Sequence, residues 1–118
     1  MKQVIYCYER CSTCRKALKW LAENGVEVEV KSIVDETPTA SELKQFYEKS
    51  GLPLRRFFNT SGMKYRELGL SQKLKDMPEI KQLELLASDG MLIKRPLFVN
   101  DELILLGFKE ENWQVLLK

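Results

Sequence analysis

Apolar and polar residues form three blocks along the chain, and each block predicts its own secondary structure. In the first block, residues 3–8 are rich in β-branched and aromatic side chains, which predicts a buried strand. Residues 12–23 carry apolar side chains at helical spacing, and Asn24 followed by Gly25 is a typical helix end. Strict alternation over residues 26–30 predicts a second strand with one polar face. This strand–helix–strand unit predicts two parallel strands joined by a right-handed crossover.

The middle block, about residues 39–90, has a helical pattern that glycine and proline interrupt. Thr39 or Ser41 is the expected N-terminal cap of its first helix, which ends before Gly51. The later helical segments are expected at residues 54–58, at residues 65–74 with a break at Gly69, and at residues 79–87 with Pro78 in the first turn.

The last block predicts a β-hairpin followed by a helix. The expected strands are residues 96–99 and 102–106, the tight turn is Asn100 and Asp101, and the helix is residues 110–117. The three blocks therefore give β-α-β, a helical insertion over about residues 39–90, and β-β-α. This order around a mixed four-stranded sheet is the thioredoxin-like arrangement, so we predict an α/β chain that forms a single domain over residues 1–118.

A pair of cysteines lies at the turn between the first strand and the first helix. Cys11 is expected at the helix N-terminus, where backbone N–H groups and the helix dipole stabilise a thiolate and lower the thiol pKa. Cys14 follows one turn later on the same side of the helix and can reach the first sulfur. Ser12 and Thr13 supply hydroxyl groups and backbone donors around the thiolate. A Cys-x-x-Cys motif at this position of a thioredoxin-like order indicates thiol redox chemistry.

Composition excludes several other classes of function. The 118 residues include 19 basic and 17 acidic side chains, and a net charge of +2 is too balanced to indicate binding to nucleic acid or to a membrane surface. No apolar stretch approaches the roughly 20 residues of a membrane span, and the first residues do not form a signal peptide. We therefore expect a cytoplasmic protein, in which a catalytic or metal-binding role for cysteine is favoured over a structural disulfide.

The chain has no histidine and only three cysteines. The lack of histidine excludes Ser-His-Asp and Cys-His catalysis and the common zinc sites that contain histidine. A four-cysteine zinc or iron–sulfur site would need one more cysteine, so we expect neither a metal nor a bound cofactor, unless carboxylates or a second subunit complete a site around Cys11 and Cys14. Cys7 in the first strand is expected to be a small buried residue, with an extra thiol partner of Cys11 as the alternative.

From end to end, the chain resembles the arsenate reductase/Spx family. The resemblance rests on residues 11–17, 67–70, 93–97 and 107–113. It implies a thioredoxin-like fold with a helical insertion, Cys11 as the nucleophile and Arg95 as an anion-binding residue beside it. It also implies a cis peptide bond before Pro96, at a place opposite the cysteine turn where Pro96 would contact the substrate backbone.

The anion-binding residues of the family are only partly present. Glutathione-dependent arsenate reductases of this fold surround the oxyanion with three arginines, and Arg95 matches one of them. Asn59 and Lys109 occupy the other two positions, and a lysine keeps the charge without the two-pronged donor geometry of arginine. Arg55 or Arg56 could supply compensating charge. Arsenate is therefore one candidate among several for the substrate.

The leading hypothesis is a thiol–disulfide oxidoreductase that acts on an oxyanion or a disulfide. Cys11 attacks as a thiolate, Cys14 resolves the intermediate by forming a disulfide, and Arg95 holds the negative group of the substrate. Thioredoxin or glutathione then restores the two thiols.

The alternative is an Spx-like redox sensor that binds the RNA polymerase α-subunit and uses the Cys-x-x-Cys pair as a switch. The middle block resembles the reductase branch more than the Spx branch. A family member with a different substrate is a further alternative.

Overall fold

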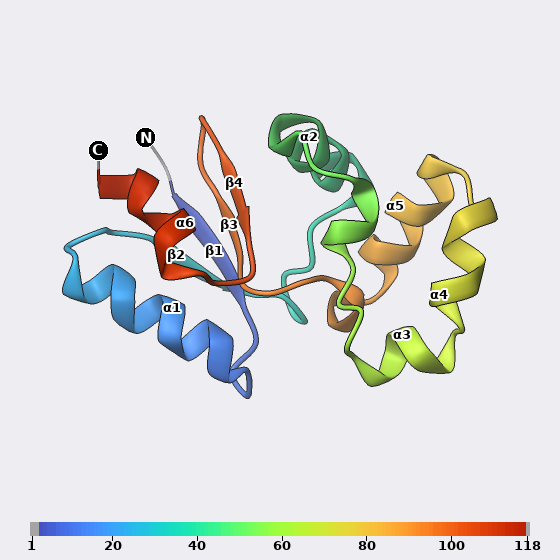
Figure 1. Cartoon of the computed structure of the whole chain (residues 1–118), viewed down its shortest axis with the longest axis horizontal. Coiled ribbons are helices and arrows are strands. Elements are labelled where there is room, and N and C mark those ends of the chain that lie inside the picture. The colour runs from blue at the N-terminus through green and yellow to red at the C-terminus, as the bar shows by residue number, and fades with distance from the viewer. Residues whose placement is uncertain (1–2, 118) are drawn as a thin grey trace.

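A four-stranded sheet occupies one half of the molecule, and a block of short helices occupies the other (Figure 1). The computed structural model describes residues 3–117. The strands are β1 (Val4–Cys7), β2 (Glu29–Ser32), β3 (Leu97–Val99) and β4 (Ile104–Leu106). The α-helices are α1 (Ser12–Glu23), α2 (Ala40–Ser50), α3 (Met63–Glu67), α4 (Leu70–Lys73), α5 (Glu79–Ser88) and α6 (Glu110–Trp113). Short 3-10 helices are η1 (Leu54–Phe57), η2 (Leu74–Asp76), η3 (Gly90–Leu92) and η4 (Gln114–Leu117).

The sheet is mixed and has the strand order β2-β1-β3-β4, which confirms the predicted fold class. β1 and β2 are parallel and are connected through α1, whereas β1–β3 and β3–β4 are antiparallel pairs. In the β1–β3 pair, Tyr6 lies opposite Leu97. The end of β1 therefore meets the start of β3, so the segment that leads to Cys11 and the segment that contains Arg95 approach the same edge of the sheet.

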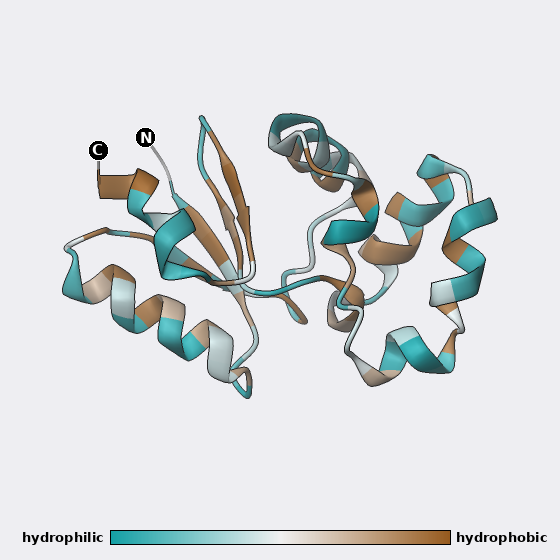
Figure 2. Cartoon of the chain, in the orientation of Figure 1, coloured by the Kyte–Doolittle hydropathy of each residue, from teal (hydrophilic) through white to brown (hydrophobic). Residues whose placement is uncertain are grey.

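Hydrophobic cores lie on both faces of the sheet. Successive residues of β1 divide between them, because side chains of a strand alternate between its faces. Ile5 and Cys7 pack with α1 and with Trp113 of α6, whereas Tyr6 belongs to the core shared with the helical block. Figure 2 shows β1, β3 and β4 as predominantly hydrophobic. Trp113 and Phe98 are buried with ring centroids 5.4 Å apart, and full burial of such a ring contributes about 3 kcal/mol.

The predicted position of the second strand is wrong by about three residues. The alternating residues 26–30 predict a strand, but β2 begins at Glu29. Gly25 has a φ of 67°, and the N–H of the next residue, Val26, donates to the carbonyl of Leu21 at 2.9 Å. The segment therefore folds back on α1, where Val26 and Val28 pack against the core before pairing with β1 starts.

Local signals predicted the helix ends well. Thr39 rather than Ser41 caps α2, in a capping box whose second member is Glu42. Gly69 separates α3 from α4 with a φ of 64°, so the predicted break is confirmed. Pro78 is the N-cap of α5 and so lies one position before its predicted place in the first turn.

β4 is shorter than the predicted strand, whereas the final helical segment has the predicted span. The Asn100 side chain accepts hydrogen bonds from the backbone of Glu102 and Leu103, so the turn extends to residue 103 and β4 starts at Ile104. The final helix changes from α6 to η4 after Trp113. None of the helices in residues 3–117 has the length and apolar character that a bilayer crossing requires.

Gly90 is expected to be essential for the packing that precedes β3. A Cβ added at this residue would overlap the backbone carbonyl of Ile33, so Gly90→Ala must push two backbone segments apart. Overpacking of this kind costs about 1–3 kcal/mol, and chemical denaturation of Gly90→Ala should show that loss in the free energy of unfolding. In the control Gly51→Ala, the new Cβ meets no atom within 4 Å, and the cost is only the backbone strain of a positive φ. Equal stability of wild type and Gly90→Ala would contradict the close approach.

Candidate functional site

Cys11 is the N-cap residue of α1, as predicted. Its backbone N–H donates to the carbonyl of Tyr8 at 3.0 Å, which closes the turn after β1. Its Sγ accepts a hydrogen bond from the backbone N–H of Cys14 at 3.3 Å. The sulfur therefore occupies the position in which an N-cap oxygen normally satisfies a free helix N–H, and a negative charge there is stabilised by the helix dipole.

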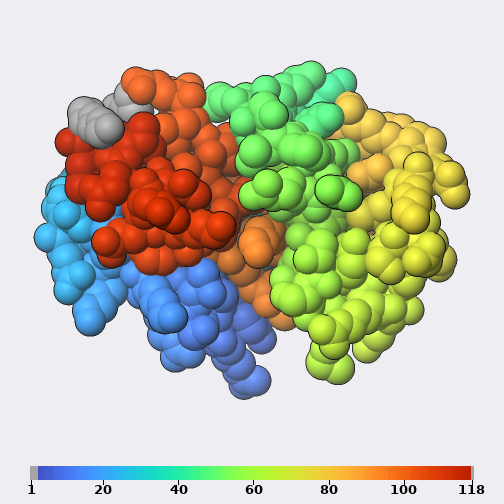
Figure 3. All heavy atoms as spheres, viewed as in Figure 1, coloured from blue at the N-terminus to red at the C-terminus, as the bar shows by residue number. Residues whose placement is uncertain are grey.

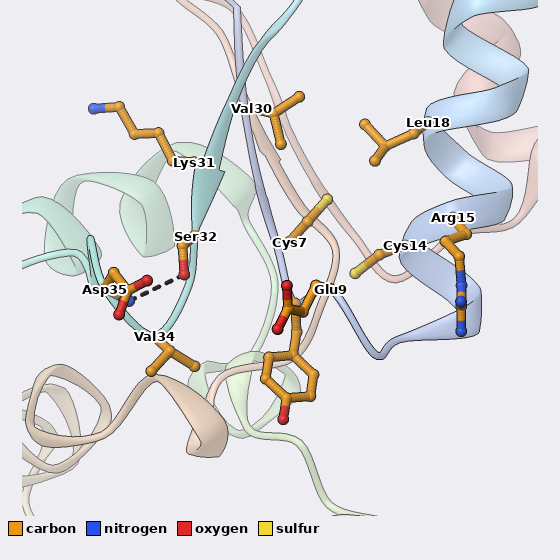
Figure 4. A pocket seen from close by; sticks show the side chains of 11 residues that line it. Cys7, Glu9, Cys14, Arg15, Leu18, Val30, Lys31, Ser32, Val34 and Asp35 are labelled. Atoms are coloured by element: carbon orange, nitrogen blue, oxygen red, sulfur yellow. Dashed lines mark hydrogen bonds between the residues drawn. The ribbon is translucent and has the colours of Figure 1, made fainter.

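The three cysteines differ in exposure. Cys11 is partly exposed, whereas Cys7 and Cys14 are buried. The thiols of Cys7 and Cys14 are hydrogen-bonded to each other. In Figure 4 both sulfur atoms lie in the space between β1 and α1, one on a side chain from the end of β1 and one on a side chain from the first turn of α1. Cys7 is therefore buried, as predicted, and its contact with Cys14 was not predicted.

The Cys7–Cys14 hydrogen bond shifts the pKa values of the two thiols in opposite directions. The Cys14 thiol lowers the pKa of Cys7, an effect that outweighs the opposing influences of burial and of Cys11. The same hydrogen bond, together with burial, raises the pKa of Cys14 well above its ordinary value. The reduced pair therefore loses its first proton from Cys7, with Cys14 as the hydrogen-bond donor.

A polar hollow of about 720 Å³ opens beside Cys11. Four of the predicted site residues, Cys11, Ser12, Thr13 and Arg95, line it together. The amide Asn59, at one of the family's arginine positions, lies in the same wall. Cys14 lines a different hollow together with Cys7. Its backbone N–H nevertheless donates to the sulfur of Cys11.

Arg95 has an unused hydrogen-bond donor. Its guanidinium lies over the ring of Tyr8, 5.1 Å from the centroid, and its Nη1 donates to the carbonyl of Met91 at 3.3 Å. Its Nε is buried and has no hydrogen-bond partner among the described residues. Because buried donors are normally paired, this nitrogen is an unsatisfied donor in a residue that lines the hollow.

Pro96 follows Arg95 through a cis peptide bond, as the resemblance implies. The proline is buried, and its carbonyl accepts a hydrogen bond from Gly107 at 2.9 Å. Arg95 lines the hollow beside Cys11, but Pro96 lines neither it nor the other hollows described here. A contact between Pro96 and a substrate stays a prediction.

A second hollow, of about 610 Å³, adjoins the first and is strongly basic. It lies where the red C-terminal segment meets the green η1 region in Figure 3. Its cationic lining residues are Arg55, Arg56, Lys94, Arg95 and Lys109, and no acidic residue lines it in the described part of the chain. Thr13, Lys94 and Arg95 line both hollows. The sequence analysis missed Lys94, although its place next to Arg95 was a usable signal.

Metal ligands do not cluster around the cysteines. Within residues 3–117, no group of three or more histidine, cysteine, aspartate or glutamate side chains could hold a metal ion. The carboxylates that could have completed a site with Cys11 and Cys14 are therefore not brought there in this part of the chain.

Comparison with known proteins places these features in a family context. The sequence model of the ArsC family matches residues 6–116. The chain is 58% identical to YusI from Bacillus subtilis, over 96% of this chain and 99% of that protein. It is 32% identical to an arsenate reductase from Neisseria meningitidis, over 96% of each protein. The global transcriptional regulator Spx 2 from Bacillus anthracis is 25% identical, over 92% of this chain and 82% of the regulator.

A solved structure agrees closely with this fold. The crystal structure of an ArsC family related protein from Bacteroides fragilis has a TM-score of 0.95 and 52% sequence identity, and the match covers 98% of both chains. The relatives thus include both an arsenate reductase and a transcriptional regulator.

Arsenate bound by Arg95 is expected to protect Cys11 from alkylation by iodoacetamide. Arg95→Ala should lose most of this protection, because a charge-assisted hydrogen bond contributes about 1.5–3 kcal/mol, and Arg95→Lys should keep part of it. Mass spectrometry of the tryptic peptide that contains Cys11 measures the alkylation rate. Lys81→Ala, which removes an exposed partner of Glu84, is the control. Full protection in Arg95→Ala would show that Arg95 does not hold the anion.

The hydrogen bond from residue 14 is expected to govern the pKa of Cys7. Two double variants leave Cys7 as the single thiol: Cys11→Ser with Cys14→Ser, and Cys11→Ser with Cys14→Ala. Serine keeps a donor and alanine does not, so the pKa of Cys7 should be lower in the serine variant by the equivalent of ~1 kcal/mol. Ultraviolet absorbance of the thiolate against pH measures it. Superimposable titration curves would rule out the hydrogen bond as the cause.

Proposed function

Since the chain belongs to the ArsC family, we propose that it is a thiol–disulfide oxidoreductase with Cys11 as the nucleophile and Cys14 as the resolving thiol. One observation carries the proposal: the partly exposed Cys11 and Arg95, whose buried Nε has no hydrogen-bond partner among the described residues, line one polar hollow. A nucleophile and a free anion donor in one hollow are what a reaction with a negatively charged, oxidised substrate needs.

The reaction begins at Cys11. Its thiolate attacks the oxidised centre of the substrate and forms a covalent adduct. At the central atom of an oxyanion the attack displaces one oxygen, which leaves as water, and at a disulfide it displaces one sulfur as a thiolate. Arg95 orients the negative group, and Ser12 and Thr13 supply further polar contacts at the wall of the hollow. Cys14 then attacks the sulfur of Cys11, the Cys11–Cys14 disulfide forms, and the product leaves with two electrons. The bond between Cys11 and the bound substrate atom breaks in this step, and the proton of Cys14 goes to the reduced product that leaves.

An external thiol completes the cycle. Thioredoxin or glutathione reduces the Cys11–Cys14 disulfide, so no bound cofactor is required. This donor chemistry fits a cytoplasmic protein, because both thiol systems belong to reducing compartments.

The cations of the second hollow support an anionic substrate. Lys94, Lys109 and the η1 arginines add positive charge beside Arg95, and the lack of an acidic lining residue in the described chain leaves that charge uncompensated within the hollow. Asn59 and Lys109 give a donor set different from three arginines, so arsenate is proposed as one candidate, with other oxyanions and anionic disulfides beside it.

A redox-dependent regulator is the second candidate, and the similarity to Spx 2 favours it. In this case the same thiol pair acts as a switch without turnover, and the partner is the RNA polymerase α-subunit. Binding of the α-subunit that changes with the redox state of the pair, together with no reduction of arsenate or of a model disulfide, would select this candidate.

Reductase assays with arsenate and with a model disulfide, each with thioredoxin and with glutathione, test the enzyme proposal. Cys11→Ser should abolish activity, because no other partly exposed thiol lies in the hollow among the described residues. Cys14→Ser should accumulate a mixed disulfide on Cys11, seen as a mass increase. Ser41→Ala, an exposed change on α2, is the control and should keep wild-type rates. Wild-type turnover in Cys11→Ser would refute the nucleophile assignment.

A further inference from the structure

The thiol chemistry of this chain extends to a third cysteine. Cys14 is the central member of the group, because it interacts with the side chains of both Cys7 and Cys11 and also donates its backbone N–H to the sulfur of Cys11. We propose that Cys7 takes over the disulfide from Cys11, so that the oxidised protein passes from a Cys11–Cys14 bridge to a Cys7–Cys14 bridge. This inference rests on the proposed function, since that function produces the first disulfide.

The two buried thiols have their own access to solvent. Cys7 and Cys14 line a hollow of about 550 Å³ together with Leu18 of α1 and Val30 of β2. Figure 4 shows the two sulfurs directed into the space between β1 and α1. Of the residues that line this hollow, only Tyr8 also lines the hollow of Cys11. Cys11 and the Cys7–Cys14 pair are therefore reached through different hollows.

The proposed step is an intramolecular thiol–disulfide exchange and needs no additional oxidant. Cys7 loses its proton to water and attacks the Sγ of Cys14. The Cys7–Cys14 bond forms, the Cys11–Cys14 bond breaks, and Cys11 leaves as a thiolate. The number of disulfides and the oxidation state of the protein do not change.

Attack at Cys14, rather than at Cys11, follows from the packing. Cys7 and Cys14 are buried in the same core and line the same hollow, whereas Cys11 lines the other hollow. The released Cys11 regains its N-cap position and its hydrogen bond from the backbone of residue 14. A thiol reductant, either a dithiol protein or a small thiol peptide, then reduces the Cys7–Cys14 bridge from the second side.

The sequence makes the two bridges easy to distinguish. Trypsin cuts after Lys2, Arg10 and Arg15, so Cys7 lies on the peptide 3–10 and the other two cysteines lie together on the peptide 11–15. A Cys11–Cys14 bridge closes the second peptide on itself. A Cys7–Cys14 bridge joins the two peptides and leaves Cys11 free for iodoacetamide. Fragmentation between residues 12 and 13 identifies which cysteine of the second peptide is linked.

The experiment oxidises the purified full chain with one equivalent of diamide, quenches it with iodoacetamide and maps the peptides. Wild type should yield the joined peptides with an alkylated Cys11. Cys7→Ser should stop at the closed peptide 11–15, with a complete loss of Cys11 alkylation in the oxidised fraction. Cys11→Ser should form the joined peptides directly. Because Cys7 is buried, Cys7→Ala is tested in parallel as the apolar match.

The outcomes distinguish failure of the proposed transfer of the disulfide from Cys11 to Cys7, here called the relay, from failure of the proposed function. If wild type gives only the closed peptide 11–15 and Cys11→Ser remains unlinked, the relay is overturned and the reductase proposal stands. If neither bridge forms under conditions that oxidise a control dithiol, the proposed function fails as well. Joined peptides in which Cys11 is the linked residue would also overturn the relay. Alkylated Cys11 in the oxidised fraction of Cys7→Ser and Cys7→Ala would overturn it as well.

Discussion

The antiparallel pairing of β1 with β3 is the constraint on which the site depends. It brings the end of β1 to the start of β3, and therefore the turn that holds Cys11 to the segment that holds Arg95. Neither residue could form the site from its own local structure. Hydrophobic packing on both faces of β1 fixes this register, since a shift by one residue would exchange Tyr6 and Cys7 between the two cores.

Positive charge in the site comes from three separate parts of the chain. The η1 turn contributes Arg55 and Arg56, the segment before β3 contributes Lys94 and Arg95, and the start of α6 contributes Lys109. Only Arg95 is held by specific contacts, a cation–π interaction with Tyr8 and a hydrogen bond to Met91. The site thus combines one fixed guanidinium with several exposed cations, an arrangement that attracts anions broadly and orients them at one point.

Features that depend on interactions between residues close together in the sequence could be predicted from the sequence. The N-cap position of Cys11, the capping of α2 by Thr39 and the break at Gly69 all depend on residues within a few positions of each other. The start of β2 could not be predicted from alternation, because packing of Val26 and Val28 against α1 competes with strand pairing. The contact between Cys7 and Cys14 and the grouping of cations from distant segments also escaped prediction, since only the three-dimensional fold brings these residues together.

The alternation of β1 has a consequence for how such a protein can diversify. Its face toward α1 carries the buried thiols, and its face toward the helical block carries Tyr6, so these thiols and the helical block belong to separate cores. Substitutions in η1 or α3 can reshape the wall opposite Cys11 without disturbing the packing of Cys7 and Cys14. A lineage can therefore change the lining of these hollows while it inherits the packing of the buried thiols unchanged.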